Sequence, residues 1–91
     1  MNDQKLEQTI SELVVSVARE NHIQISPAPN GPLENIVGDQ WFYDYRSPKI
    51  VLTRPNKGLD DFVEVTDQQT PEILAIELRA AFDRLLSKSN S

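Results

Sequence analysis

Apolar residues in the first part of the chain recur with the period of a helix. They stand at Leu6, Ile10, Leu13, Val14 and Val17. At about 100° per residue these positions fall in one stripe, with polar residues around the rest of the circumference. The pattern predicts an amphipathic helix over residues 3–20.

A second helical pattern occupies the end of the chain. Thr70, Pro71 and Glu72 combine a capping hydroxyl, a first-turn proline and an acid at the positive end of the helix dipole. The apolar stripe that follows consists of Leu74, Leu78, Ala81, Phe82 and Leu85. We expect a helix over residues 71–87 and a frayed tail over residues 88–91.

Between the two helical patterns the apolar residues recur with a period of two, as in a β-strand. The segments "WFYDYR", "KIVLT" and "DFVEV" alternate or are rich in β-branched residues, and turn residues at 47–48 and 55–58 separate them. We predict a β-meander of three to five strands over about residues 22–66. The whole chain, residues 1–91, then forms one α+β domain, a two-layer sandwich with both helices on one face of a small antiparallel sheet.

The aromatic run from Trp41 to Tyr45 contains two alternating sets of side chains, of which one must face the core. The pattern leaves open which set that is. If Trp41, Tyr43 and Tyr45 face away from the helices, they form an exposed patch of the kind that marks protein interfaces. These three residues are therefore candidates for contact with a protein partner.

Four cations follow the aromatic run with no carboxylate between them, and we call them the basic island: Arg46, Lys49, Arg54 and Lys57. Residues 1–45 carry seven acids and two bases, and residues 58–91 carry seven acids and three bases. The basic island is therefore a positive segment between two acidic ones, in a chain of net charge -5. One interpretation is protection of a sheet edge. The other is contact with an acidic protein surface, which two pairs of cations about 15–20 Å apart would suit. The acidic flanks argue against nucleic acid as a partner.

The composition also bears on which kinds of catalytic or metal site the chain can form. The 91 residues include no cysteine and a single histidine, His22, so no thiolate and no nucleophile–histidine constellation is recognisable. Neither a run of about 20 apolar residues nor a signal-peptide pattern is present. We expect a non-catalytic cytoplasmic protein without a membrane span, a monomer or weak homodimer, with no certain cofactor. An acidic cluster at Asp60, Asp61, Glu64 and Asp67 either holds a hard cation or solvates a strand and its turn.

Four segments in chain order resemble frataxin and its bacterial counterparts. They are "GPLENIVGD", "WFYDYRSP", "KIVLTRPNKG" and "PEILAIELRAAF". The resemblance implies two helices over an antiparallel sheet, docking to the cysteine desulfurase machinery that builds iron–sulfur clusters, and iron binding at carboxylates near the first helix. The positions nearest to that iron-binding role are Asp3, Glu7, Glu12, Glu20 and Glu34. The chain departs from the family at Val51, where the family has an exposed tryptophan.

Two functions therefore stay open. The first is a frataxin-like, iron-binding adaptor of iron–sulfur cluster assembly. The second is a protein-interaction module, an inhibitor or regulator, that docks through its sheet face and the basic island.

Overall fold

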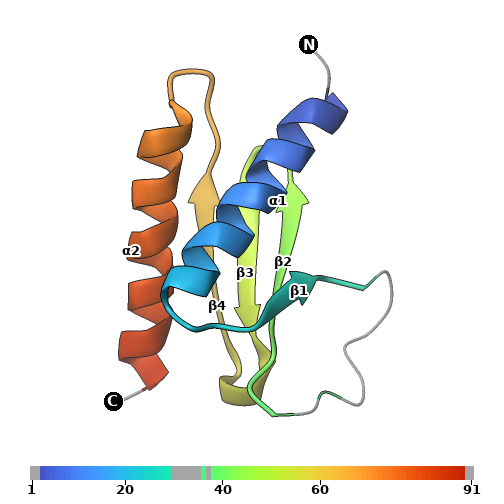
Figure 1. Ribbon diagram of the computed structural model, residues 1–91. Coiled ribbons are helices and arrows are strands. Elements are labelled where there is room, and N and C mark those ends of the chain that lie inside the picture. The colour runs from blue at the N-terminus through green and yellow to red at the C-terminus, as the bar shows by residue number, and fades with distance from the viewer. Residues whose placement is uncertain (1–2, 30–35, 37, 90–91) are drawn as a thin grey trace.

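A helix stands first and another stands last among the elements of the described chain, and the strands lie between them in sequence (Figure 1). The computed structural model describes residues 3–29, 36 and 38–89. Its elements in chain order are α1 (Asp3–Glu20), β1 (Ile25–Pro27), β2 (Trp41–Arg46), β3 (Lys49–Arg54), the 3-10 helix η1 (Pro55–Lys57), β4 (Leu59–Glu64) and α2 (Pro71–Ser89).

Helix α1 spans the predicted residues, and its end is closed by the two residues that follow it. His22 adopts the left-handed backbone conformation, with φ of 57°, and its N–H donates to the Arg19 carbonyl at 3.1 Å. Asn21 caps the same turn because its Nδ2 donates to the Val17 carbonyl at 3.0 Å. These contacts satisfy carbonyl groups that a helix end leaves without partners.

Helix α2 begins at the predicted cap. The N–H of Ile73 donates to Thr70 Oγ1 at 3.2 Å, and Pro71 is the first helical residue. The helix continues through Ser89, so the predicted end at residue 87 is two residues too early. Residues 90 and 91 of the predicted frayed tail lie outside the described residues.

The sheet has four strands in the order β1-β2-β3-β4. Strand β2 pairs antiparallel with β3, and β3 pairs antiparallel with β4, as the meander predicts. Strand β1 differs, because it pairs parallel with β2. Parallel neighbours require a connection of about a dozen residues or more, which residues 28–40 provide here. The sheet is therefore mixed rather than wholly antiparallel.

The core lies between one face of the sheet and the two helices, which confirms the predicted α+β sandwich (Figure 1). The ring of Trp41 packs against that of Phe82 from α2, with centroids 5.6 Å apart. The fully buried side chains also include Ile10, Val14, Val17, Ile50, Leu52, Leu78 and Leu85. Between the two helices, Arg79 of α2 forms a bidentate ion pair with Glu20 of α1. Its Nε donates to Oε1 at 2.8 Å and its Nη2 donates to Oε2 at 3.0 Å.

Candidate functional site

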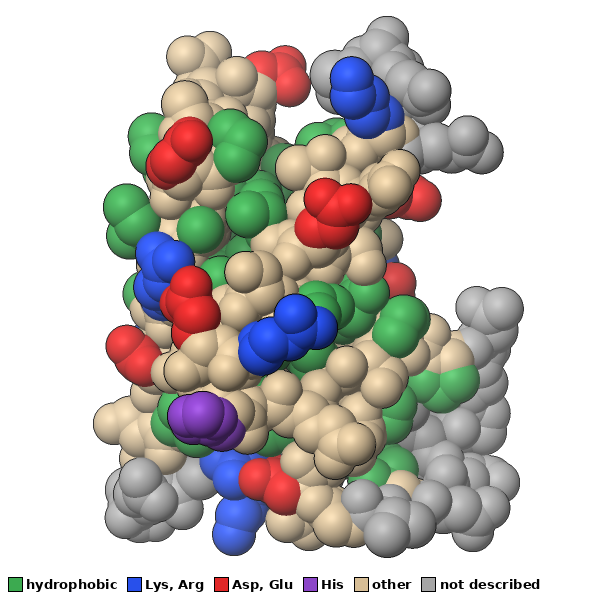
Figure 2. Space-filling view, in the orientation of Figure 1, with side chains coloured by type: hydrophobic (Ala, Val, Ile, Leu, Met, Phe, Trp, Pro, Cys, Tyr) green, Lys and Arg blue, Asp and Glu red, His purple; other side chains and the backbone are tan. Residues whose placement is uncertain are grey.

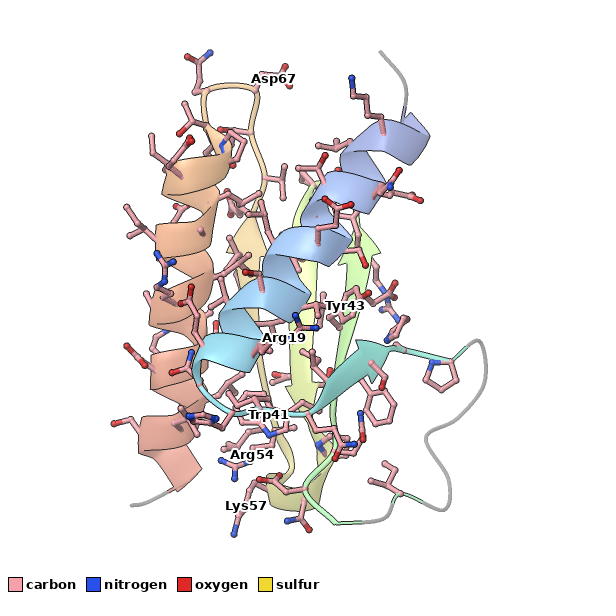
Figure 3. All side chains as sticks on the ribbon, in the orientation of Figure 1. Arg19, Trp41, Tyr43, Arg54, Lys57 and Asp67 are labelled. Atoms are coloured by element: carbon pink, nitrogen blue, oxygen red, sulfur yellow. The ribbon has the colours of Figure 1, made fainter. Side chains whose placement is uncertain are left out.

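The aromatic run of β2 turns its tryptophan and first tyrosine into the core (Figure 3). Trp41 is 2% exposed and Tyr43 is 9% exposed, so the interpretation that they form a surface patch is corrected. Tyr45 is only partly buried, and it packs against the same core. The register explains this choice of face, because Tyr43 lies opposite Leu52 and Tyr45 lies opposite Ile50. Residues directly opposite each other share a face of the sheet.

The opposite face of the sheet carries an apolar stripe, which we call the outer-face patch: Phe42, Val51 and Phe62. Both helices lie on the other face, so none of the described helices covers this patch. Val51 lies opposite Phe62 across β3 and β4, and Phe42 stands diagonally across from Val51 on β2. Phe62 is 46% exposed, although it is a large apolar side chain on a strand. A contiguous apolar group on a sheet face is a feature of binding surfaces.

The cations at the β2–β3 turn border the outer-face patch. Lys49 Nζ lies 4.4 Å from the centroid of the Phe62 ring, a cation–π contact, and Lys49 also stands opposite Glu64 on β4. Arg46 Nε donates to Asp44 Oδ2 at 2.8 Å, and the Arg46 side chain is 77% exposed. Each cation therefore has a carboxylate neighbour, and the charge at this end of the island is balanced locally.

Arg54, at the other end of the island, is buried rather than exposed. Its Nε donates to Asp39 Oδ1 at 2.9 Å, its Nη2 donates to Asp39 Oδ2 at 2.5 Å, and its guanidinium stacks 4.9 Å from the Trp41 ring. The hydrogen bonds from Arg54 hold the pKa of Asp39 below its usual range, because they outweigh the opposing effect of burial. Arg54 is thus corrected from an exposed contact residue to a structural one. Lys57 in η1 is exposed at the same end of the molecule (Figure 3).

The carboxylates that the frataxin resemblance would assign to iron do not converge in the described part of the chain. Glu20 is held by Arg79, whose hydrogen bonds lower the Glu20 pKa. Glu7 and Glu12 are exposed on α1, and Glu12 accepts a 3.4 Å hydrogen bond from Gln8. Among the described residues no group of three or more histidine, cysteine or acidic side chains is placed to hold a metal ion. Asp3 is the first residue of α1, and Glu34 lies outside the described residues.

Acidic and basic side chains are interspersed over the helix-bearing face that Figure 2 shows, with no continuous acidic ridge along α1 in this view.

The acidic residues of β4 are divided between the two faces of the sheet. Asp61 points toward the helices, where Arg84 Nε donates to it at 2.8 Å and lowers its pKa. Asp60 and Glu64 belong to the opposite face because side chains alternate along β4.

Comparison with family models, with curated proteins and with solved structures finds no match for this chain. Neither helix in the described part of the chain has the length and apolarity that crossing a membrane would require. A role for the outer-face patch therefore rests on the residues that form it. The patch was missed in the sequence because Val51 and Phe62 belong to different segments, and only the strand register brings them together.

Proposed function

We propose that this protein is a non-catalytic protein-binding module of the cytoplasm that docks through the outer-face patch. The observation that carries the proposal is Phe62, a phenylalanine 46% exposed beside Val51 on a sheet face that neither helix covers. Aromatic side chains at the centre of such a surface contribute most of the binding energy when a partner buries them. The lack of cysteine is compatible with the reducing cytoplasm.

The charges around the patch indicate what the partner presents. Because Arg46 is paired with Asp44 and Lys49 stands opposite Glu64, the rim has little net charge to attract an acidic surface from a distance. The partner that fits is a protein with an exposed apolar surface and a rim of mixed charge. Its association rate should depend only weakly on salt, since strong salt dependence reflects steering by unbalanced charge.

The frataxin resemblance supplies a second candidate, an iron-binding adaptor that docks to the cysteine desulfurase machinery. The order of helix, strands and helix supports it. The parallel pairing of β1 and the ion pair that engages Glu20 weigh against it. The protein-binding module therefore has the stronger support.

The test compares the wild-type protein with two serine variants as immobilised bait in extracts of the native host. Phe62→Ser removes the exposed ring from the patch, and Ile76→Ser removes an apolar side chain that is 61% exposed on α2. We expect the specifically captured protein to be retained by Ile76→Ser and lost with Phe62→Ser. Equal capture by all three proteins would refute the assignment of this face.

A further inference from the structure

A groove runs between strand β4 and helix α2, which lie side by side and run in opposite directions (Figure 1). It has a volume of about 310 Å³, and its lining consists of Phe62, Val63, Glu64, Glu77, Ala80 and Arg84. The three helix residues are spaced i, i+3 and i+7, so they lie on one face of α2. Because Phe62 belongs both to this lining and to the outer-face patch, the groove and the patch adjoin.

The two ends of the groove differ in charge. At one end Arg84 is engaged, because its Nε and Nη2 donate to the Asp61 carboxylate at 2.8 and 3.2 Å. The other end, next to the β4–α2 connection, carries the carboxylates of Glu64 and Glu77. Neither of these forms an ion pair with a residue in the described part of the chain. The groove therefore has one neutral end and one negative end.

Gln69 holds the acidic end of the groove together. Its Nε2 donates to the Glu64 carbonyl at 2.9 Å and also to the Glu77 carboxylate, so one amide keeps that carboxylate beside β4. Lys49 is the cation opposite Glu64 in the strand register, but its Nζ lies over the Phe62 ring. Both glutamates are exposed, and an ionised carboxylate has several acceptor positions. They can therefore bind a cation that comes from outside the chain.

The backbone of β4 offers little to a further strand at this groove. The Phe62 N–H already donates to Asp61 Oδ1 at 2.7 Å, and the Glu64 carbonyl accepts from Gln69. Blocked backbone groups and charged side chains keep an edge strand from pairing with other strands. A segment that lies in this groove is therefore recognised through its side chains.

We propose that the partner of the outer-face patch presents a basic side chain, lysine or arginine, close to an apolar one. The basic group binds the carboxylates of Glu64 and Glu77, and the apolar side chain lies against Phe62 and Ala80. This assignment rests on the proposed function, since it takes the patch as the docking surface. Complementary charges fix the register of an interface and suppress wrong partners. A partner with an acidic residue at this place would meet two carboxylates and be rejected.

A displayed library of random peptides, selected on the wild-type protein, tests this chemistry without knowledge of the natural partner. We expect the enriched peptides to carry lysine or arginine close to a large apolar residue. Synthetic copies of these peptides are then titrated calorimetrically. A variant that combines Glu64→Gln and Glu77→Gln should weaken their binding roughly tenfold, because the partner's cation then loses both charged acceptors. Phe62→Ser should weaken the same peptides, because it removes the ring that the apolar residue contacts.

Two further variants make the comparison specific. Asp83→Asn neutralises an exposed acid of α2 that does not line the groove, and it should leave the dissociation constants unchanged. A second selection on Glu77→Lys should enrich acidic residues in place of basic ones beside the apolar residue. Circular dichroism verifies the fold of each variant. The glutamine variants retain the shape of the side chains at two exposed positions, and an amide oxygen at position 77 can still accept from Gln69.

Several results would overturn the proposal. Among them are a selection that enriches no peptide, enriched peptides without a basic residue, and basic peptides that bind the double glutamine variant as tightly as the wild type. Basic peptides that bind Phe62→Ser undiminished also overturn it, because the carboxylates then act apart from the patch. A wild-type dimer that Phe62→Ser dissociates in sedimentation velocity would make a second copy the occupant instead. The proposed function fails by a different result, equal capture of the host protein by the wild type and Phe62→Ser.

Discussion

The ion pair between Arg54 and Asp39 offers a prediction with an internal control. In Asp39→Asn the side chain keeps its shape and one acceptor oxygen but loses its charge, which leaves the Arg54 cation, with a side chain only 11% exposed, beside a neutral group. The control is Asp44→Asn, because Asp44 and Asp39 are equally exposed, at 42% each. The two variants differ in the burial of the arginine that each aspartate binds, since the side chain of Arg46, the partner of Asp44, is 77% exposed.

The burial of each arginine determines how much free energy of unfolding is lost when its aspartate partner is replaced. Breaking a fully buried ion pair costs about 3–5 kcal/mol, and breaking an exposed one costs about 0–1 kcal/mol. Because solvent reaches Asp39 but scarcely reaches Arg54, we expect Asp39→Asn to lower the free energy of unfolding by about 1–3 kcal/mol. Asp44→Asn should lower it by less than about 0.5 kcal/mol. Urea unfolding followed by fluorescence measures both, since Trp41 is the only tryptophan and stacks on Arg54.

The stability that Asp39 contributes to the fold depends on pH, and the direction of this dependence follows from its pKa. The pKa of Asp39 is lowered in the folded chain, so its contribution to stability is present above the unfolded-state pKa of about 4. That contribution is lost as the pH falls through the lower folded-state pKa. The stabilities of the wild type and Asp39→Asn should therefore converge in acid. Equal losses in Asp39→Asn and Asp44→Asn at neutral pH, or a gap that persists unchanged in acid, would show that the Asp39 charge does not stabilise the fold through Arg54.

Three further predictions follow from the packing and the charges. Leu78→Ala, at a fully buried position, should cost about 2–5 kcal/mol in a urea melt, whereas Ile76→Ala, at a position 61% exposed, should cost less than about 1 kcal/mol; similar losses would show that the inner face of α2 is misassigned. Arg54→Glu should destabilise the fold because it places a carboxylate beside Asp39, while Arg46→Glu should barely change the melting temperature; the reverse order would contradict the burial of Arg54. Titration with ferrous and ferric iron, followed by NMR, should give no saturable shifts on α1; shifts centred on Glu7 and Glu12 that vanish in their glutamine variants would favour the frataxin-like adaptor instead.

The helices could be predicted from the sequence because their signals are local. The stripe from Leu6 to Val17 defines α1, and the cap at Thr70 with Pro71 starts α2 within the chain segment itself. The alternation in β2, β3 and β4 likewise gave the meander. What alternation leaves undecided is the side, because both sets of the aromatic run contain large apolar residues.

The strand register decides which set of aromatic side chains faces the core. A turn of two residues places Tyr45 opposite Ile50, and the apolar pair of Ile50 and Leu52 then draws Tyr43 and Tyr45 to the core. The sequence carries part of that signal, since "KIVLT" places its isoleucine and leucine on one face and its lysine, valine and threonine on the other. The parallel pairing of β1 and the contact of Asp39 with Arg54 are different, because each depends on the path of a long connection that local patterns do not specify.

Photo-crosslinking in the native host tests whether a partner docks on the outer face of the sheet. A benzophenone amino acid replaces Phe62 in one variant and Ile76 in another, so that each reports only on molecules within reach of its own face. We expect a discrete adduct with one other protein from position 62 and none of that mass from position 76. No adduct from position 62, or the same adduct from both positions, would contradict docking on this face.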